Sequence, residues 1–205
     1  MLSLQVRDLA KRYNQRQVFA GLNVTVTDGT SLAITGPNGS GKSTLIRVLC
    51  GLTRPNGGQV TVSLDGASLS PAECRAQIGL VAPDLALYHE LTALENLSFF
   101  AQVRGLTTNV ADLEALLERV GLAARGDDLV GAYSSGMRQR LKYAQALLHR
   151  PRLLFLDEPT ANLDEAGSAI VAEIIAEQKQ RGILVLATNE PEEVYYGDQI
   201  LRLGS

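Results

Sequence analysis

The chain has 205 residues, with 19 lysines and arginines against 22 aspartates and glutamates, and a formal net charge of −3. This length is enough for one domain with a substantial core, and 45% hydrophobic against 20% charged residues excludes a chain that is disordered throughout. The mild acidity argues against a broad basic surface, so we expect no nucleic-acid partner. The apolar runs are too short to cross a bilayer, and two cysteines are too few for a disulfide framework.

Strand-like and helix-like segments alternate along the chain. Alternating apolar residues predict strands at residues 2–6, 21–26 and 59–64. Short, fully apolar or nearly apolar runs predict buried strands at residues 31–35, 78–81, 153–156 and 183–187. Helical spacing of apolar residues predicts helices at residues 43–50, 92–103, 110–120 and 135–148.

This order of elements indicates an α/β protein with a mainly parallel sheet. Residues 1–84 and 150–205 would form the lobe that contains the sheet. Residues 85–149 are almost free of strand signals and would form a helical insert.

A glycine-rich segment lies between the strand expected at residues 31–35 and the helix expected at 43–50. It reads Gly36-Pro37-Asn38-Gly39-Ser40-Gly41-Lys42-Ser43, followed by Thr44, and matches the phosphate-loop pattern G-x-x-x-x-G-K-[ST]. Backbone amides of such a loop and the N-terminus of the next helix bind phosphate oxygens. Lys42 would reach the β- and γ-phosphates, and Ser43 would ligate Mg²⁺. The alternative is a glycine-rich turn with a solvated lysine, which the flanking strand and helix disfavour.

Two acids, Asp157 and Glu158, end the apolar run at residues 153–156. The carboxyl end of a parallel strand opens into the crevice where α/β proteins bind ligands. Asp157 suits a role at Mg²⁺, and Glu158 is placed to polarise an attacking water. A solvated acidic turn is the alternative, and the presence of a phosphate loop disfavours it.

Between these two centres lies Tyr133-Ser134-Ser135-Gly136-Met137-Arg138-Gln139-Arg140, and Leu163-Asp164 follows the acids. In this order, the motifs resemble the nucleotide-binding domains of ABC transporters over nearly the whole chain. The resemblance implies a phosphate-loop NTPase fold in a single domain, with a mainly parallel central sheet, an antiparallel β subdomain and a helical insert. It also implies ATP and Mg²⁺ as cofactors and ATP hydrolysis as the activity.

The resemblance carries further roles onto positions outside the phosphate loop. Ser134, Ser135 and Gly136 would cap the γ-phosphate that is held by a second copy of the domain, in an ATP-dependent head-to-tail homodimer. Tyr13 would stack on adenine, and Asp164 would belong to the loop that communicates between the two sites. An ordinary N-capped helix and an isolated surface tyrosine are the alternative explanations.

Two positions depart from the family pattern. Pro83 stands where the family has a glutamine, and a proline ring offers no donor or acceptor to Mg²⁺ or water. Asn189 stands where the family has a histidine; its amide can donate a hydrogen bond to a γ-phosphate oxygen but carries no charge. We therefore expect normal binding of ATP and Mg²⁺ and slow hydrolysis, with Lys42, Glu158 and Asn189 as the catalytic groups.

Family members of this build work as pairs beneath separate membrane subunits. The apolar stretch at residues 83–100 would receive such a subunit, besides supplying the core of the helical lobe. The resemblance therefore implies a cytoplasmic protein, peripheral on the inner face of the cell membrane, that powers export. Residues 51–55 and 91–97 and the short length resemble the haem-exporter ATPases of cytochrome c maturation. The alternative is a regulatory subunit in which ATP drives dimerisation with little turnover.

Overall fold

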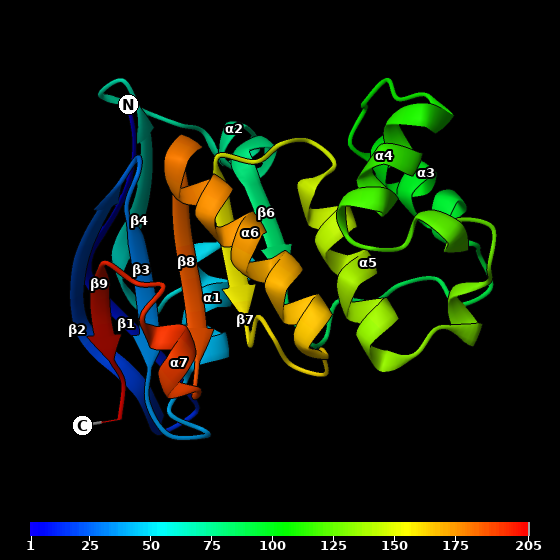
Figure 1. Cartoon of the computed structure of the whole chain (residues 1–205). Coiled ribbons are helices and arrows are strands. Elements are labelled where there is room, and N and C mark those ends of the chain that lie inside the picture. Colours follow the sequence, from blue (N-terminus) through cyan, green and yellow to red (C-terminus); the bar gives the residue numbers. More distant parts are fainter. Residues whose placement is uncertain (205) are drawn as a thin grey trace. The chain divides into compact units, whose positions relative to one another are not determined.

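The computed structural model describes residues 1–204 (Figure 1). They divide into two compact units, of which the first holds residues 1–80, 152–159 and 175 onward, and the second holds residues 81–151 and 160–174. The expected boundaries lie at residues 84 and 150, whereas this division lies after residues 80 and 151 and also places residues 160–174 in the second unit. Helix α6 (Glu165–Arg181) is one continuous helix, but its residues up to 174 belong to the second unit and those from 175 belong to the first.

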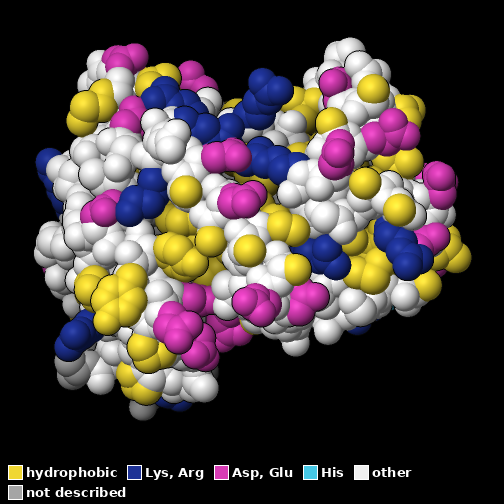
Figure 2. All heavy atoms as spheres, in the orientation of Figure 1, with side chains coloured by type: hydrophobic (Ala, Val, Ile, Leu, Met, Phe, Trp, Pro, Cys, Tyr) yellow, Lys and Arg dark blue, Asp and Glu magenta, His cyan; other side chains and the backbone are white. Residues whose placement is uncertain are grey.

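The surface carries charges of both signs. Figure 2 shows lysine and arginine side chains interspersed with aspartate and glutamate side chains on one face, rather than a single broad basic area. This agrees with the small net charge of −3. Within residues 1–204, no helix combines the length and the apolar character that crossing a membrane requires.

Two sheets form the first unit. The antiparallel sheet has the order β2-β1-β4-β5, with bounds Arg16–Thr27, Leu2–Tyr13, Gly57–Leu64 and Ala67–Ser68. The other sheet has the order β6-β7-β8-β3-β9, with bounds Ile78–Val81, Leu153–Asp157, Ile183–Thr188, Ser31–Thr35 and Gln199–Arg202. Strand β3 pairs in parallel with β8 and β9, and β7 pairs in parallel with β8. The predicted mainly parallel sheet and antiparallel β subdomain are confirmed.

Strands β1 and β2 are both longer than predicted. Their pairing continues to the end of a hairpin, where Tyr13 lies opposite Arg16. Polar residues such as Lys11 and Arg16 interrupt the apolar alternation, so periodicity alone did not reveal these extensions. The extension carries the hairpin to the phosphate loop, where Val18 approaches Gly41.

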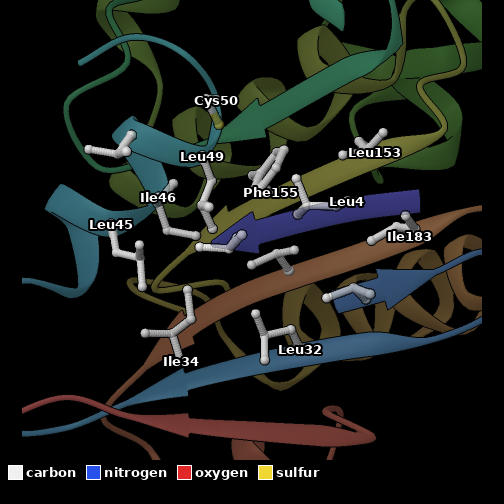
Figure 3. Close-up of a cluster of buried hydrophobic side chains, with 14 of the residues drawn as sticks. Leu4, Leu32, Ile34, Leu45, Ile46, Leu49, Cys50, Leu153, Phe155 and Ile183 are labelled. Atoms are coloured by element: carbon white, nitrogen blue, oxygen red, sulfur yellow. The ribbon is translucent and has the colours of Figure 1, made fainter. Parts of the chain in front are cut away.

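A hydrophobic core joins the strands of both sheets to helix α1 (Lys42–Leu49) (Figure 3). Leu45 and Ile46 of α1 and Phe155 of β7 are fully buried in it. Every residue of β7 and β8 is buried, which explains why these strands are continuous apolar runs. Burial of one such large side chain contributes about 1.5–3 kcal/mol, so this core holds β3 and α1 firmly on either side of the phosphate loop.

Three main helices form much of the second unit: α3 (Ala93–Val103), α4 (Val110–Arg119) and α5 (Ser135–Leu147). Each begins after a residue whose side chain accepts a hydrogen bond from the backbone of the first turn, namely Thr92, Asn109 and Ser134. Buried Asn96 fixes the loop before α3, since its amide bonds both the N–H and the carbonyl of Tyr88 at 2.9 Å.

Three α-helices of the described residues lie outside the predicted elements: α2 (Pro71–Gln77), α6 and α7 (Pro191–Val194). Helix α2 has no buried residue and therefore no apolar stripe; its signal is the capping box that Ser70 and Glu73 form. Helix α7 has only four residues, too few to show a period. Helix α6 does bury apolar residues, including Val171 and Ile174, so its pattern was present in the sequence and was missed.

Candidate functional site

The phosphate loop joins the end of β3 to the start of α1. Gly41 has a φ of 102° and directly precedes the helix. A Cβ atom at this residue would lie 2.2 Å from Val18 Cγ1, so both the backbone and the close approach of β2 require glycine. The first turn of α1 contains no acidic residue. Its unpaired N–H groups and the helix dipole therefore make this end of the helix suitable for an anion.

Lys42 is buried and its ammonium group faces three protein acceptors. Nζ lies 2.8 Å from the carbonyl oxygen of Gly36, 3.3 Å from that of Pro37 and 2.5 Å from Oδ1 of Asn189. The amide group of Asn189 in turn donates to Oδ1 of Asn38 at 2.5 Å. Asn189 thus connects the lysine to the tip of the phosphate loop, from its position directly after β8.

A cavity of about 650 Å³ opens beside this loop. Its lining brings together the predicted residues Tyr13, Glu158 and 38–44. Gly36, Pro37 and Asn189 line a second cavity, of about 550 Å³. Four further residues of the first cavity were not predicted as site residues: Arg16, Gln17, Val18 and Gly204. The first of these could have been found from the hairpin, because a two-residue turn places Arg16 opposite Tyr13.

The two acids at the end of β7 lie in different environments. Asp157 is 4% exposed, whereas Glu158 is exposed and lines the 650 Å³ cavity. The N–H of Glu158 donates to the carbonyl of Ala187 at 2.9 Å, so the strand pairing continues to this residue. Its φ of 54° then turns the chain in a conformation that non-glycine residues adopt rarely. Such local strain, held by the surrounding strands, is a feature that gathers at functional sites.

Cys50 directly follows α1 and is buried. Burial, and secondly the negative charge of Asp157, raise the pKa of its thiol well above the ordinary value. Since the thiolate is the reactive form of cysteine, Cys50 serves as a small buried side chain of the core.

The other predicted site residues lie in the second unit. Ser134 and Ser135 are exposed at the start of α5, and Ser134 Oγ accepts a hydrogen bond from the N–H of Met137 at 3.1 Å. A Cβ atom on Gly136 would lie 2.9 Å from the carbonyl oxygen of Asn162, so this position favours glycine. Asp164 is exposed, and its Oδ1 accepts from the N–H of Gly167 at 2.8 Å at the start of α6.

A lysine that the sequence analysis did not consider holds the segment around Pro83. Lys142 of α5 is 9% exposed, and its Nζ donates to the carbonyl oxygens of Ala82 at 3.1 Å and Pro83 at 2.7 Å. Burial lowers the pKa of Lys142, while the charge of Asp84 acts in the opposite direction. Proline at position 83 therefore lacks a functional side chain but supplies a carbonyl acceptor.

Three aromatic rings cluster in the stretch at residues 83–100. The ring centroids of Tyr88 and Phe99 lie 4.9 Å apart, edge to face, and those of Phe99 and Phe100 lie 5.3 Å apart. Tyr88 is 46% exposed and Phe99 is 38% exposed, so part of the cluster remains open to solvent. This exposed cluster is distinct from the buried Leu97 and Ala101 of the same helix, which supply the core.

Comparisons with known proteins agree with this geometry. The family model described as "ABC transporter" matches residues 19–161. The linearmycin resistance ATP-binding protein LnrL of Bacillus subtilis is 35% identical over 94% of this chain and 63% of its own length. The daunorubicin resistance ATP-binding protein DrrA3 of Streptomyces coeruleorubidus is 39% identical over 92% of this chain and 60% of its own length. A fluoroquinolones export ATP-binding protein of Mycobacterium tuberculosis is 40% identical over 90% of this chain and 62% of its own length.

The chain therefore spans about three fifths of the length of each of these relatives. Among solved structures, an ATP-binding subunit of an ABC transporter is 32% identical and superimposes with a TM-score of 0.84, over 98% of this chain and 85% of that one. The cassette MJ0796 has the same fold, with a TM-score of 0.86 at 24% identity over 98% of this chain and 94% of that one. On the family match and these identities, the chain belongs to the ABC transporter family and has the fold of its ATP-binding cassette.

Proposed function

We propose that this chain binds MgATP in the cavity of about 650 Å³ and hydrolyses it to power export through separate membrane subunits. One observation carries the proposal: this cavity brings an aromatic ring, a phosphate loop and an acid together, in Tyr13, Lys42 and Glu158. These are the groups needed to hold a base, hold a triphosphate and orient a water. The family of the chain supports the same activity.

The chemistry required of these residues is positioning and charge stabilisation. Lys42 has acceptors for all three of its N–H donors, so a phosphate oxygen entering the loop would replace one of them. Of the three acceptors, only Asn189 is a side chain. If the phosphate oxygen displaces Asn189, Lys42 keeps its hydrogen bonds to the loop carbonyls. Glu158, at the cavity wall, would accept a hydrogen bond from the attacking water.

The donor atoms available for Mg²⁺ are those the ion prefers. Ser43 offers a hydroxyl oxygen and Asp157 a carboxylate, and Mg²⁺ is usually bound by one or two such oxygens together with phosphates and waters. Within the part of the chain that the structure describes, no group of three His, Cys, Asp or Glu residues could hold a metal by itself. The residues thus fit an ion that arrives with the nucleotide and neutralises charge on its phosphates.

The segment at residues 134–136 and Asp164 support an ATP-dependent head-to-tail homodimer. The segment lies at the start of α5 and Asp164 lies at the start of α6, and both have exposed polar groups. Such helix starts suit contact with the γ-phosphate held by a second copy. The solved cassette MJ0796 is dimeric in a post-hydrolysis state with bound ADP and Pi.

For the cargo, the relatives favour drug-like small molecules. Three of them are described as resistance or export proteins for linearmycin, daunorubicin and fluoroquinolones. The haem export predicted from sequence finds no support in these descriptions. We propose that the exposed cluster of Tyr88, Phe99 and Phe100 receives an apolar helix of the membrane subunit, in a helix-in-groove mode. The chain would then work at the cytoplasmic face of the cell membrane.

Steady-state phosphate release with MgATP tests the activity. We expect measurable release by the purified chain, and a loss of about 10²–10⁴-fold in Glu158→Gln, as for removal of a general base. Binding of MgATP should persist in this variant, because the phosphate loop is untouched. Equal rates in the two proteins would show that Glu158 does not activate water.

The cargo requires a second experiment with the membrane subunits that copurify with this chain. Reconstituted in vesicles with those subunits, the chain should show phosphate release that daunorubicin or linearmycin stimulates. Stimulation by haem and not by these drugs would reverse the assignment of cargo.

A different role, in which ATP drives dimerisation with little turnover, is favoured by the absence of a side-chain acceptor at Pro83 and of a charge at Asn189. Size-exclusion chromatography with MgATP separates the two roles. A stable dimer that forms in wild type and releases no phosphate would favour the regulatory role.

A further inference from the structure

We propose that Lys11 is a positioning residue for nucleotide binding, because its ammonium holds the Tyr13 ring in place for the base. The inference rests on the proposed function and extends it to a residue outside the motifs described above. It concerns one contact: Lys11 Nζ lies over the Tyr13 ring, 4.7 Å from its centroid.

Lys11 is an unusual residue for its surroundings. It lies on β1 and is only 9% exposed. Its Nζ donates to the carbonyl oxygen of Arg54 at 2.8 Å, and within residues 1–204 no carboxylate forms an ion pair with it. A buried ammonium without a carboxylate is costly, and an apolar side chain would fill the same space at less cost. The remaining electrostatic partner of Lys11 is the negative face of the Tyr13 ring.

Irregular pairing of β1 with β2 affects the directions of the Lys11 and Tyr13 side chains. Register shifts between β1 and β2 occur on both sides of Lys11, and irregularities of this kind redirect the side chains of a strand. Asn56 supports the same point, since its Oδ1 accepts from the N–H of Arg12 at 2.8 Å. After the last shift, Arg12 pairs with Gln17 and Tyr13 pairs with Arg16. Tyr13 and Arg16 both line the cavity beside the phosphate loop.

Tyr13 needs such a support because little else restrains it. Its side chain is 50% exposed, at the end of a hairpin. The ammonium covers one face of the ring, and the same ring lines the cavity beside the phosphate loop. A base binds more tightly to a ring whose orientation is already set, because less rotamer freedom is lost on binding. Lys11 thus acts through Tyr13 and does not itself touch the nucleotide.

The test compares two ligands that differ in the base. Dissociation constants for MgATP and for inorganic tripolyphosphate are measured by calorimetry on the full chain. In Lys11→Gln, the amide still donates to Arg54 O but the cation is gone. We expect MgATP to bind about threefold to tenfold more weakly, as for loss of a partly desolvated cation–π contact, and tripolyphosphate to bind as in wild type.

Three variants serve as controls. Lys11→Arg keeps a cation over the ring and should restore the affinity for MgATP. Arg12→Gln removes the same charge from the neighbouring exposed residue and should leave the ratio of the two affinities unchanged. In a Tyr13→Ala background, Lys11→Gln should have no further effect. If Lys11→Gln does not fold, Lys11→Met, of similar length and also uncharged, replaces it.

Equal weakening of both ligands by Lys11→Gln would overturn the proposal, because it would show only a loss of positive charge near the phosphates. Unchanged binding of MgATP would overturn it as well. Failure of the proposed function looks different: wild type would then bind MgATP without releasing phosphate, while the ratio of affinities would still decide the role of Lys11.

Discussion

Lys42 Nζ and Asn189 Oδ1 lie 2.5 Å apart, and the other end of the same amide bonds Asn38 at 2.5 Å. One neutral side chain therefore connects Lys42 to the tip of the phosphate loop. An amide can do this because it is both acceptor and donor, whereas a protonated histidine is a donor only. We infer that Asn189 must release Lys42 before the lysine can bind a γ-phosphate.

The first prediction concerns this position. Asn189→His should raise the rate of phosphate release at saturating MgATP, because a histidine can carry a proton and a charge to the γ-phosphate and does not hold Lys42 as an amide does. Steady-state rates of phosphate release by wild type and by the variant measure the change. Lys42→Ala, which lacks the ammonium, is the inactive control. An unchanged rate would show that Asn189 does not limit phosphate release.

The second prediction separates capping from catalysis. Ser134→Ala removes the side chain that caps α5, and Thr92→Ala removes the one that caps α3. Both changes should lower the free energy of unfolding by about 1 kcal/mol. Only Ser134→Ala should also weaken MgATP-dependent dimerisation and phosphate release. Urea unfolding and size-exclusion chromatography give the two readouts; equal dimerisation in both variants would leave Ser134 as a cap alone.

Part of the fold and of the candidate site could be predicted from the sequence. The phosphate loop, the buried strands and the acids at a strand end could be predicted because each depends on short-range pattern: glycine spacing, apolar runs and a polar residue at a fixed offset. The roles assigned to Ser134 and Asp164 stay predictions. What could not be predicted depends on contacts distant in sequence, such as Lys11 with Arg54, Lys142 with Pro83 and Asn189 with Lys42.

The third prediction uses pH. Burial raises the pKa of Asp198, but hydrogen bonds from Lys179 and Ser31 outweigh this effect and lower the pKa below its ordinary value. The carboxylate therefore stabilises the fold above the unfolded pKa of about 3.9, and this contribution is lost as pH falls through the lower folded-state pKa.

Asp198→Asn should consequently cost about 0.5–1 kcal/mol in the free energy of unfolding at pH 7, and the difference from wild type should shrink toward pH 3. Urea titrations at both pH values measure it. Asp128→Asn is the matched control, since Asp128 forms an exposed ion pair with Arg125 at 3.1 Å. A difference that stays constant between pH 7 and pH 3 would contradict the assignment to the ionised carboxyl.

The fourth prediction concerns the aromatic cluster on α3. Phe99→Ser should reduce the stimulation of phosphate release by the membrane subunits several-fold, because it removes an exposed edge-to-face ring from the proposed docking surface. Val110→Ser changes an apolar residue that is 62% exposed on α4 and should retain full stimulation. The ratio of stimulated to unstimulated rates measures the effect, and equal ratios would exclude the cluster as a docking surface.

The backbone of Glu158 carries a consequence for the evolution of this protein. A φ of 54° suits glycine or asparagine better than glutamate, so selection for stability alone would favour replacing this residue. A library of position-158 variants that is sorted only by resistance to heat should therefore be enriched in glycine and asparagine. These variants should release phosphate more slowly than wild type. Under the proposed function, the fold would tolerate a less favourable residue at this position because the acid would orient the attacking water.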